Sequence, residues 1–222
     1  MTMKTTKKPR PALSKESVLH AALELAGLEG IESLSMRKLG KRLGVEAMSL
    51  YNHVANKDEI LGGIVDLVVS EIELPEEGED WKEGMRKRAT SSREVFRRYP
   101  WALGLLESRS QKSPLAMDHY NRVFGCLRQA GFSVPMTAYT LTILDSYIYG
   151  FALQESSSPY SSSKEIIGKA KDILRQPDTN PYPYVAELIT EYIMQPDYSY
   201  AKEFDLGLEL ILDGIERTKG KY

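Results

Sequence analysis

Apolar residues recur three and four positions apart along most of this chain, and this period predicts α-helices rather than strands. A segment rich in proline, glycine and acidic residues over 74–80 divides the pattern into two parts. Serine-rich and proline-rich segments interrupt it again over 156–163 and 176–184. We therefore expect an all-α protein. Its helices are expected over residues 15–28, 57–72, 81–99, 101–108, 115–130, 135–155, 164–174, 185–194 and 200–219, with two more short helices between 34 and 57.

The segment between residues 34 and 57 has the pattern of two short helices joined by a tight turn. Ser35 is suited to capping the first short helix, and Gly44 suits the left-handed position that ends it. The second short helix is expected over 46–54, with its apolar residues facing the first. Two helices around a glycine turn form the geometry that places a recognition helix in the major groove of DNA. The residues expected to pack the pair together are Leu39, Leu43, Leu50 and Val54.

The outward face of the second short helix carries small, amide, phenol and imidazole side chains, with cations beside it where a phosphate backbone would pass. Ser49 and Asn52 are expected to read base edges, and Ala47 and Met48 to contact thymine methyl groups. The alternative is an αα-corner of some helical domain, with the cations forming an ordinary solvated face. The predicted DNA contacts are Ser35, Arg37, Ala47, Met48, Ser49, Tyr51, Asn52, His53 and Lys57.

The formal net charge is −2, but the charge is unevenly distributed along the chain. Residues 1–57 hold ten Lys and Arg against five Asp and Glu, whereas the remainder holds nineteen against twenty-six. A basic N-terminal part on an acidic body is typical of a DNA-binding protein with a separate second function. Residues 1–13 contain cations and no acid, which predicts a basic flexible arm that lies along DNA or stays a solvated tail.

Residues 14–69 resemble the DNA-binding domain of the TetR family of bacterial transcriptional regulators. The run SKESVLHAALELAGLEGIESLSMRKLGKRLGV and the later SLYNHVANKDEIL both look like that family. The spacing of residues that is characteristic of this family is found at Leu50, Tyr51, His53, Asn56 and Lys57. The fragment FDLGLELILDGIE is similar to the C-terminal end of the drug-responsive members.

This resemblance implies a homodimer that binds pseudo-palindromic operator DNA and releases it when a small molecule binds. It implies a three-helix, helix-turn-helix DNA-binding domain over 14–73 after the basic arm over 1–13. An effector-binding and dimerisation domain is expected over 81–222. Within it, the helices over 135–155 and 200–219 resemble the dimerising four-helix bundle of the family.

Aromatic and methionine side chains in the body suit either a core or an apolar ligand cavity. The expected ligand contacts are Trp101, Leu105, Met117, Tyr120, Phe124, Ile143, Tyr147, Phe151 and Gln154, with Gln154 or Asp145 as the polar contact. Tetracycline-type members hold a magnesium–drug chelate with a histidine and carboxylates. The corresponding stretch here, 101–111, has no histidine, and Gln154 stands where those members place a glutamate. We therefore expect a mostly apolar or aromatic effector of unknown identity, with no metal and no cofactor.

The sequence gives little support to catalysis, because it lacks G-x-S-x-G, H-E-x-x-H, P-loop, Rossmann and Cys/His metal motifs. Cys126 is the only cysteine, so no intrachain disulfide is expected. No apolar run approaches the roughly 18 residues of a membrane helix, and the N-terminus lacks the apolar segment of a secretory signal. We expect a cytoplasmic protein that is not an enzyme and has no membrane partner.

Three functions are consistent with these patterns. The first is a repressor that a small-molecule effector releases from its operator. The second keeps the DNA binding but makes the chain an activator or a ligand-independent regulator. The third is a helical small-molecule-binding protein whose αα-corner is incidental. A mobility shift with genomic fragments separates the third function from the other two.

Overall fold

The computed structural model describes residues 13–108, 113–160, 162–175 and 182–220, and within these ranges it contains helices and no strands. The predicted all-α fold is confirmed, whereas nearly all of the predicted arm over 1–13 lies outside the described residues. The elements are α1 (Lys15–Glu29), a 3-10 turn η1 (Ile31–Ser33), α2 (Met36–Leu43), α3 (Ala47–Leu50), α4 (Lys57–Ser70), α5 (Trp81–Arg98), α6 (Pro100–Ser108), α7 (Pro114–Gln129), α8 (Val134–Ser157), α9 (Ser163–Leu174), α10 (Pro183–Leu188), a π-helical segment η3 (Ile189–Ile193) and α11 (Tyr200–Thr218).

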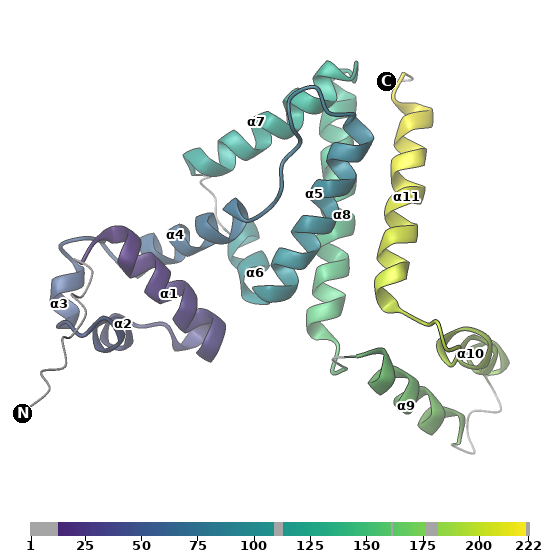
Figure 1. Ribbon diagram of the computed structural model, residues 1–222, viewed down its shortest axis with the longest axis horizontal. Coiled ribbons are helices and arrows are strands. Elements are labelled where there is room, and N and C mark those ends of the chain that lie inside the picture. The colour runs from purple at the N-terminus through teal and green to yellow at the C-terminus, as the bar shows by residue number, and fades with distance from the viewer. Residues whose placement is uncertain (1–12, 109–112, 161, 176–181, 221–222) are drawn as a thin grey trace, which may run out of the picture.

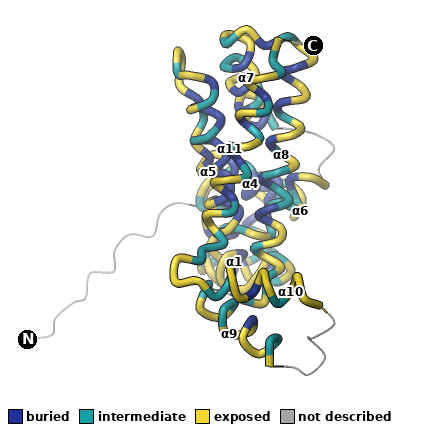
Figure 2. Tube along the Cα trace, turned by 90° about the vertical axis from the view of Figure 1, so that its right-hand side faces the viewer, coloured by how far each residue is buried: buried dark blue, intermediate teal, exposed yellow. Residues whose placement is uncertain are grey.

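The molecule has a small head and a larger body, and α4 runs from one to the other (Figure 1). Helices α1, α2 and α3 form the head, and their apolar side chains meet the first half of α4 in one hydrophobic core. In the body, α5 and α8 pack together, α11 lies along them, and α6 and α7 lie between these long helices and α4. Buried positions concentrate in the body where α4, α5 and α8 meet (Figure 2).

Helix α4 belongs to both hydrophobic cores. Ile60 and Ile64 are buried in the head core, whereas Val65, Val68 and Val69 are buried in the body core. The two groups of side chains are consecutive along one uninterrupted helix. The head is therefore connected to the body by a rigid element, without a flexible linker between the two cores.

The turn between α2 and α3 depends on two glycines. Gly44 ends α2 in the left-handed conformation, with φ of +71°, and its N–H bonds back to the carbonyls of Gly40 and Lys41. At Gly40 the two helices approach so closely that an added Cβ would lie 2.8 Å from the carbonyl oxygen of Val45. A side chain at either glycine is therefore unfavourable, for a conformational reason at Gly44 and a steric one at Gly40.

The second short helix is shorter than predicted. The sequence pattern predicted a helix over 46–54, but α3 ends at Leu50 and residues 51–53 continue it as tight turns. The N–H groups of Tyr51, Asn52 and His53 bond to carbonyls three residues back instead of four. The segment keeps the helical direction in a tighter, 3-10-like form, so the buried Leu50 and Val54 still anchor it.

We expect Gly40→Ala to lower the free energy of unfolding of the head by about 1–3 kcal/mol, because the new methyl group overpacks the turn. Gly27→Ala is the matched control, since Gly27 is also helical but nothing lies within 4 Å of its Cβ position. That variant should be as stable as the parent or more stable, by up to about 1 kcal/mol. Urea unfolding measures both, and equal stability of the two variants would contradict the close approach.

Candidate DNA-binding interface and interior cavity

The predicted DNA contacts lie around the α2–α3 turn and the start of α4. Met48 is 75 % exposed and Tyr51 is 47 % exposed, which leaves two large side chains of α3 and its extension open to solvent. The Ser35 hydroxyl accepts a hydrogen bond from the backbone N–H of Lys38, so it caps α2. The remaining predicted contacts are exposed at Arg37, Asn52 and Lys57 and half-buried at Ala47, Ser49 and His53.

The four cations of α2 divide into two pairs on different sides of the helix. Lys38 pairs with Glu29 at 2.6 Å, and Arg42 pairs with Glu24 at 2.6 Å, so one side is bound to α1. Arg37 and Lys41, four residues apart, form no ion pair with any residue that the structure describes. The same holds, across the described ranges, for Lys57 in the first turn of α4. These three cations are available to phosphate groups.

A buried ion pair lies in the body, between α5 and α8. Arg88 is only 3 % exposed, and its Nη2 donates to Asp145 Oδ1 at 2.7 Å. Its Nε donates to Nε2 of His119, on α7, at 3.3 Å. Burial, together with the charges of Arg88 and Arg122, lowers the pKa of His119 to about 4, so this imidazole is neutral near pH 7.

A small, partly open cavity adjoins this cluster, with a volume of about 20 Å³. Arg88, His119, Tyr120 and Tyr149 provide its polar side chains. Burial raises the pKa of both tyrosines, which keeps their phenol groups protonated. The remaining lining residues are apolar or small: Val69, Ile72, Leu106 and Ala116.

The structure places the nine predicted ligand contacts at several locations in the body. Tyr120 lines the small cavity beside Arg88. Trp101 and Leu105 pack at the edge of the body core, and Trp101 also contacts the head core. Three others are among the exposed large hydrophobics, namely Met117 at 58 %, Phe124 at 38 % and Ile143 at 44 %. The rest lie beside the start of α11: Tyr147, Phe151 and Gln154.

Three members of the buried cluster were missed in the sequence analysis: Arg88, His119 and Tyr149. The fourth, Asp145, was expected only as an alternative polar contact for the ligand. The burial of Arg88 was indicated by the pattern of apolar residues along α5. The buried face of α5 includes Trp81, Met85, Arg88, Ser92 and Val95, spaced by four and three residues, and so places a cation in an apolar stripe. An arginine at such a position needs a buried acceptor, which directs attention to the acid of a neighbouring helix.

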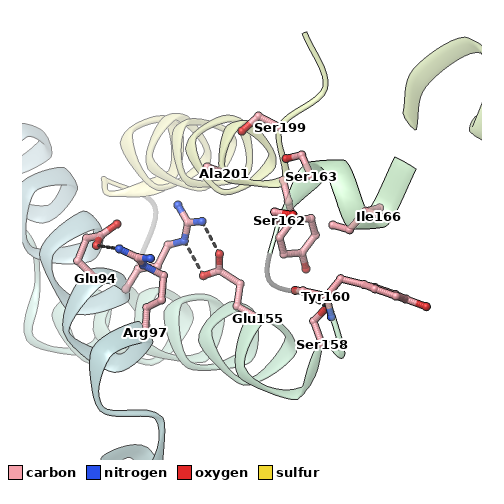
Figure 3. A pocket seen from close by; sticks show the side chains of 12 residues that line it. Glu94, Arg97, Glu155, Ser158, Tyr160, Ser162, Ser163, Ile166, Ser199 and Ala201 are labelled. Atoms are coloured by element: carbon pink, nitrogen blue, oxygen red, sulfur yellow. Dashed lines mark hydrogen bonds and ion pairs between the residues drawn. The ribbon is translucent and has the colours of Figure 1, made fainter. Parts of the chain in front are cut away.

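A wider cleft opens on the surface near the start of α11 (Figure 3), with a volume of about 410 Å³. Charged and hydroxyl side chains line much of it, and Arg93 forms two hydrogen bonds with Glu155 there, at 2.8 and 2.5 Å. Arg97 pairs with Glu94 at 2.8 Å on the same side. None of the nine predicted ligand contacts lines this cleft.

The outer faces of α8 and α11 are apolar. Tyr139, Ile143 and Leu153 of α8 are exposed, and so are Leu206 and Leu210 of α11, at 64 % and 63 %. The spacing of four between Leu206 and Leu210, and between Tyr139 and Ile143, puts each pair on one helical face.

The inner side of α11 is bound to α5 by charge. Arg86 of α5 donates to both carboxylate oxygens of Glu209, at 2.5 and 2.9 Å. One turn earlier on α5, Lys82 pairs with Asp213. Helix α11 therefore has one side fixed within the subunit and an apolar side open to solvent.

A helix-turn-helix head, joined by a shared helix to a larger helical body, has the architecture of a DNA-binding regulator with a separate second domain. The family model "Bacterial regulatory proteins, tetR family" matches residues 18–64. The model "Tetracyclin repressor-like, C-terminal domain" matches residues 74–219. The chain belongs to the TetR family of bacterial transcriptional regulators.

Relatives of known role support the same assignment. The transcriptional repressor DrrR1 of Streptomyces coeruleorubidus is 31 % identical over 217 residues, which cover 94 % of this chain and 79 % of the relative. The class D tetracycline repressor of Escherichia coli is 31 % identical over 208 residues, covering 92 % and 89 %. The crystal structure of ActR of Streptomyces coelicolor in complex with actinorhodin has a TM-score of 0.77 at 28 % identity, covering 95 % and 99 %. Among the described residues, no helix is long and apolar enough to span a membrane.

The buried His119 predicts a loss of stability in mild acid. Its pKa is about 4 in the folded chain and near its ordinary value of 6.5 when unfolded, so between these values only the unfolded state binds the proton. Stability therefore falls as the pH falls through this window, by about 2 kcal/mol between pH 7.5 and 5. His119→Gln should remove most of this change in urea unfolding. His20 is exposed, so His20→Gln is the control and should keep the dependence of stability on pH. If the unfolding free energy changed equally with pH in both variants, the burial of His119 would be contradicted.

Proposed function

We propose that this chain is a dimeric repressor that holds its operator through the head and releases it when an effector enters the body. The DNA-binding domain is taken as residues 14–73 and the effector-binding and dimerisation domain as 81–222. The observation that carries the proposal is a set of cations that flank the exposed α3 segment and have no ion-pair partner among the described residues. The relatives of the chain include the repressor DrrR1. Such a regulator acts on DNA in the cytoplasm, and we assign it no catalytic activity.

Operator contacts divide into two kinds. Arg37, Lys41 and Lys57 lack internal partners among the described residues, so they are suited to phosphate oxygens, which position a protein without reading sequence. Asn52 is exposed and can offer its amide to an adenine edge, and Met48 can contact a thymine methyl group. Tyr51, Ser35, Ala47, Ser49 and His53 complete the proposed surface.

The apolar faces of α8 and α11 supply the proposed dimer contact. Leu206 and Leu210 of one subunit, with Ile143 and Tyr139, would meet the same side chains of a second copy related by a twofold axis. A dimer puts two α3 segments on successive major grooves, about 34–36 Å apart for one helical turn. The charged inner side of α11 keeps this face in a fixed orientation toward the partner.

Release requires a difference in affinity between two states. To change the population from 1:99 to 99:1, an effector must bind the DNA-free state more tightly by about 5.5 kcal/mol. Helix α4 is the element through which this energy would act, since Val69 lies in the body core and Ile60 in the head core. An effector that moves the second half of α4 necessarily moves the first half with it.

The test of the repressor proposal is footprinting and anisotropy titration of the purified chain on the DNA flanking its own gene. We expect a protected site of twofold symmetry, with transcription lower in the presence of the protein. Failure to bind any fragment of that DNA more tightly than random duplex, at low salt, would overturn the proposal. Higher transcription on binding would make the chain an activator.

We expect Lys57→Ala to weaken binding to operator and to unrelated duplex by a similar factor, because it removes a phosphate contact. The logarithm of the DNA-binding constant falls linearly with the logarithm of the salt concentration, and the magnitude of this slope should become smaller by about 1. Lys38→Ala is the matched control, since its ammonium group is already held by Glu29, and it should change the slope much less. Anisotropy titrations at four salt concentrations measure both. The assignment fails if the two variants are indistinguishable.

We expect Leu210→Glu to convert the dimer into monomers, because it puts a charge in the apolar contact. The dissociation constant of the dimer should rise at least about a hundredfold, which corresponds to roughly 2.7 kcal/mol. Leu28→Glu is the control, since Leu28 is 74 % exposed on α1, away from the proposed face. Sedimentation velocity over a concentration series measures the mass. A Leu210→Glu protein that stays dimeric at micromolar concentration would exclude this face.

A further inference from the structure

One nitrogen of the buried guanidinium of Arg88 has no partner. Nη2 is bonded to Asp145 and Nε to His119, but Nη1 is fully buried and has no hydrogen-bond acceptor among the described residues. A buried donor without an acceptor is costly, and such atoms are rare in folded proteins. This nitrogen therefore indicates a position where an acceptor from outside the chain is favourable.

The unpartnered nitrogen belongs to a residue that lines this small cavity. The cavity has space for little more than one water-sized group, since its volume is about 20 Å³. An aromatic ring needs far more room; an engineered apolar cavity of about 150 Å³ is the scale that admits benzene. An aromatic ligand would therefore bind only if the surrounding helices α4, α6 and α7 move apart.

The charges around the cavity are already balanced. Asp145 neutralises Arg88 at 2.7 Å, and His119 is neutral near pH 7 because burial lowers its pKa to about 4. A second anion next to Arg88 would leave a net buried negative charge, which is strongly unfavourable. The site therefore favours an acceptor that carries no charge.

The lining offers hydrogen-bond donors on an otherwise apolar wall. Besides Arg88 Nη1, the phenols of Tyr120 and Tyr149 are protonated and able to donate. Because His119 accepts from Arg88 at Nε2, its proton lies on Nδ1, which is a donor too. Val69 of α4 and Ile72, two residues beyond the end of that helix, form part of the apolar wall. Donors on an apolar, aromatic wall suit a flat ligand with acceptor oxygens.

Resting on the proposed repressor function, we propose that this cavity is the effector site and takes an uncharged aromatic molecule. A carbonyl or similar oxygen of that molecule accepts a hydrogen bond from Arg88 Nη1. Entry of the ring displaces the cavity wall at Val69, in the second half of α4, and at Ile72, just after the end of that helix. The same event therefore satisfies the buried nitrogen and moves the helix that carries the head.

Three probes of nearly equal shape test the chemical class. Fluorenone carries an uncharged carbonyl, fluorene has no oxygen, and fluorene-9-carboxylate carries a negative charge. Calorimetry with the DNA-free, full-length chain should show fluorenone binding at least about tenfold more tightly than either of the other two. Equal binding of all three probes, or no binding of fluorenone, would overturn the proposal.

Two variants locate the contact. Arg88→Met should remove the preference for fluorenone over fluorene. Asp145→Asn leaves Arg88 without its counter-ion and should raise the affinity for fluorene-9-carboxylate about tenfold or more, while fluorenone binding changes little. This reversal of charge preference is not expected from a merely structural role, and it keeps the test decisive if Arg88→Met fails to fold. The control is Arg97→Met in the surface cleft of Figure 3, which should keep the preference of the parent chain.

Operator release is measured separately, by anisotropy with labelled operator DNA and fluorenone. Binding that depends on Arg88 and releases the DNA supports both proposals. Binding that depends on Arg88 but leaves the DNA bound would overturn the effector role and the coupling through α4, while DNA binding itself stands. Release by fluorenone that is unchanged in Arg88→Met and Asp145→Asn would overturn this site and leave the repressor function intact.

Discussion

Helix α4 is the physical constraint on which the rest of this structure depends, because one uninterrupted rod contributes side chains to two hydrophobic cores. Ile64 packs in the head and Val65, the next residue, packs in the body. A helix of 14 residues is about 21 Å long and does not bend without a break in its hydrogen bonds. Any displacement of its second half therefore reaches the α2–α3 turn as a movement of the whole head.

Ion pairs hold three long helices of the body together. Helix α5 is bonded to α8 by Arg88 and Arg93, and to α11 by Arg86. The Arg88–Asp145 pair need not add net stability, since desolvation costs offset the attraction, but removing one partner leaves a buried charge. The three helices α5, α8 and α11 thus keep their relative positions. The cavity lies between this frame and the helices α4, α6 and α7, which contribute Val69, Leu106 and Ala116 to its apolar wall.

The sequence predicted the helices well because their signals are local. Ser14, Ser113 and Ser133 each cap a helix where serine precedes an apolar period, and Gly44 ends α2 as expected. The head was predictable in more detail, since its turn and its resemblance lie within one continuous segment. The interior cavity was not, because Arg88, His119 and Asp145 come from three helices and only packing brings them together. Aromatic spacing alone did not show whether Phe124 and Tyr147 face a cavity, a neighbouring helix or solvent.

The two functions of α8 follow from the positions of two residues on opposite sides of it. Ile143 is exposed on the outer, apolar face, whereas Asp145, two residues later, bonds inward to Arg88. Residues two apart on a helix are separated by about 200°, so the proposed dimer contact and the proposed effector site share one backbone without overlapping. In a dimer joined through α8 and α11, this helix is the fixed reference for both subunits. A movement of α4 relative to α8 then changes the distance between the two heads while the contact between subunits stays intact, so release of DNA does not require the dimer to dissociate.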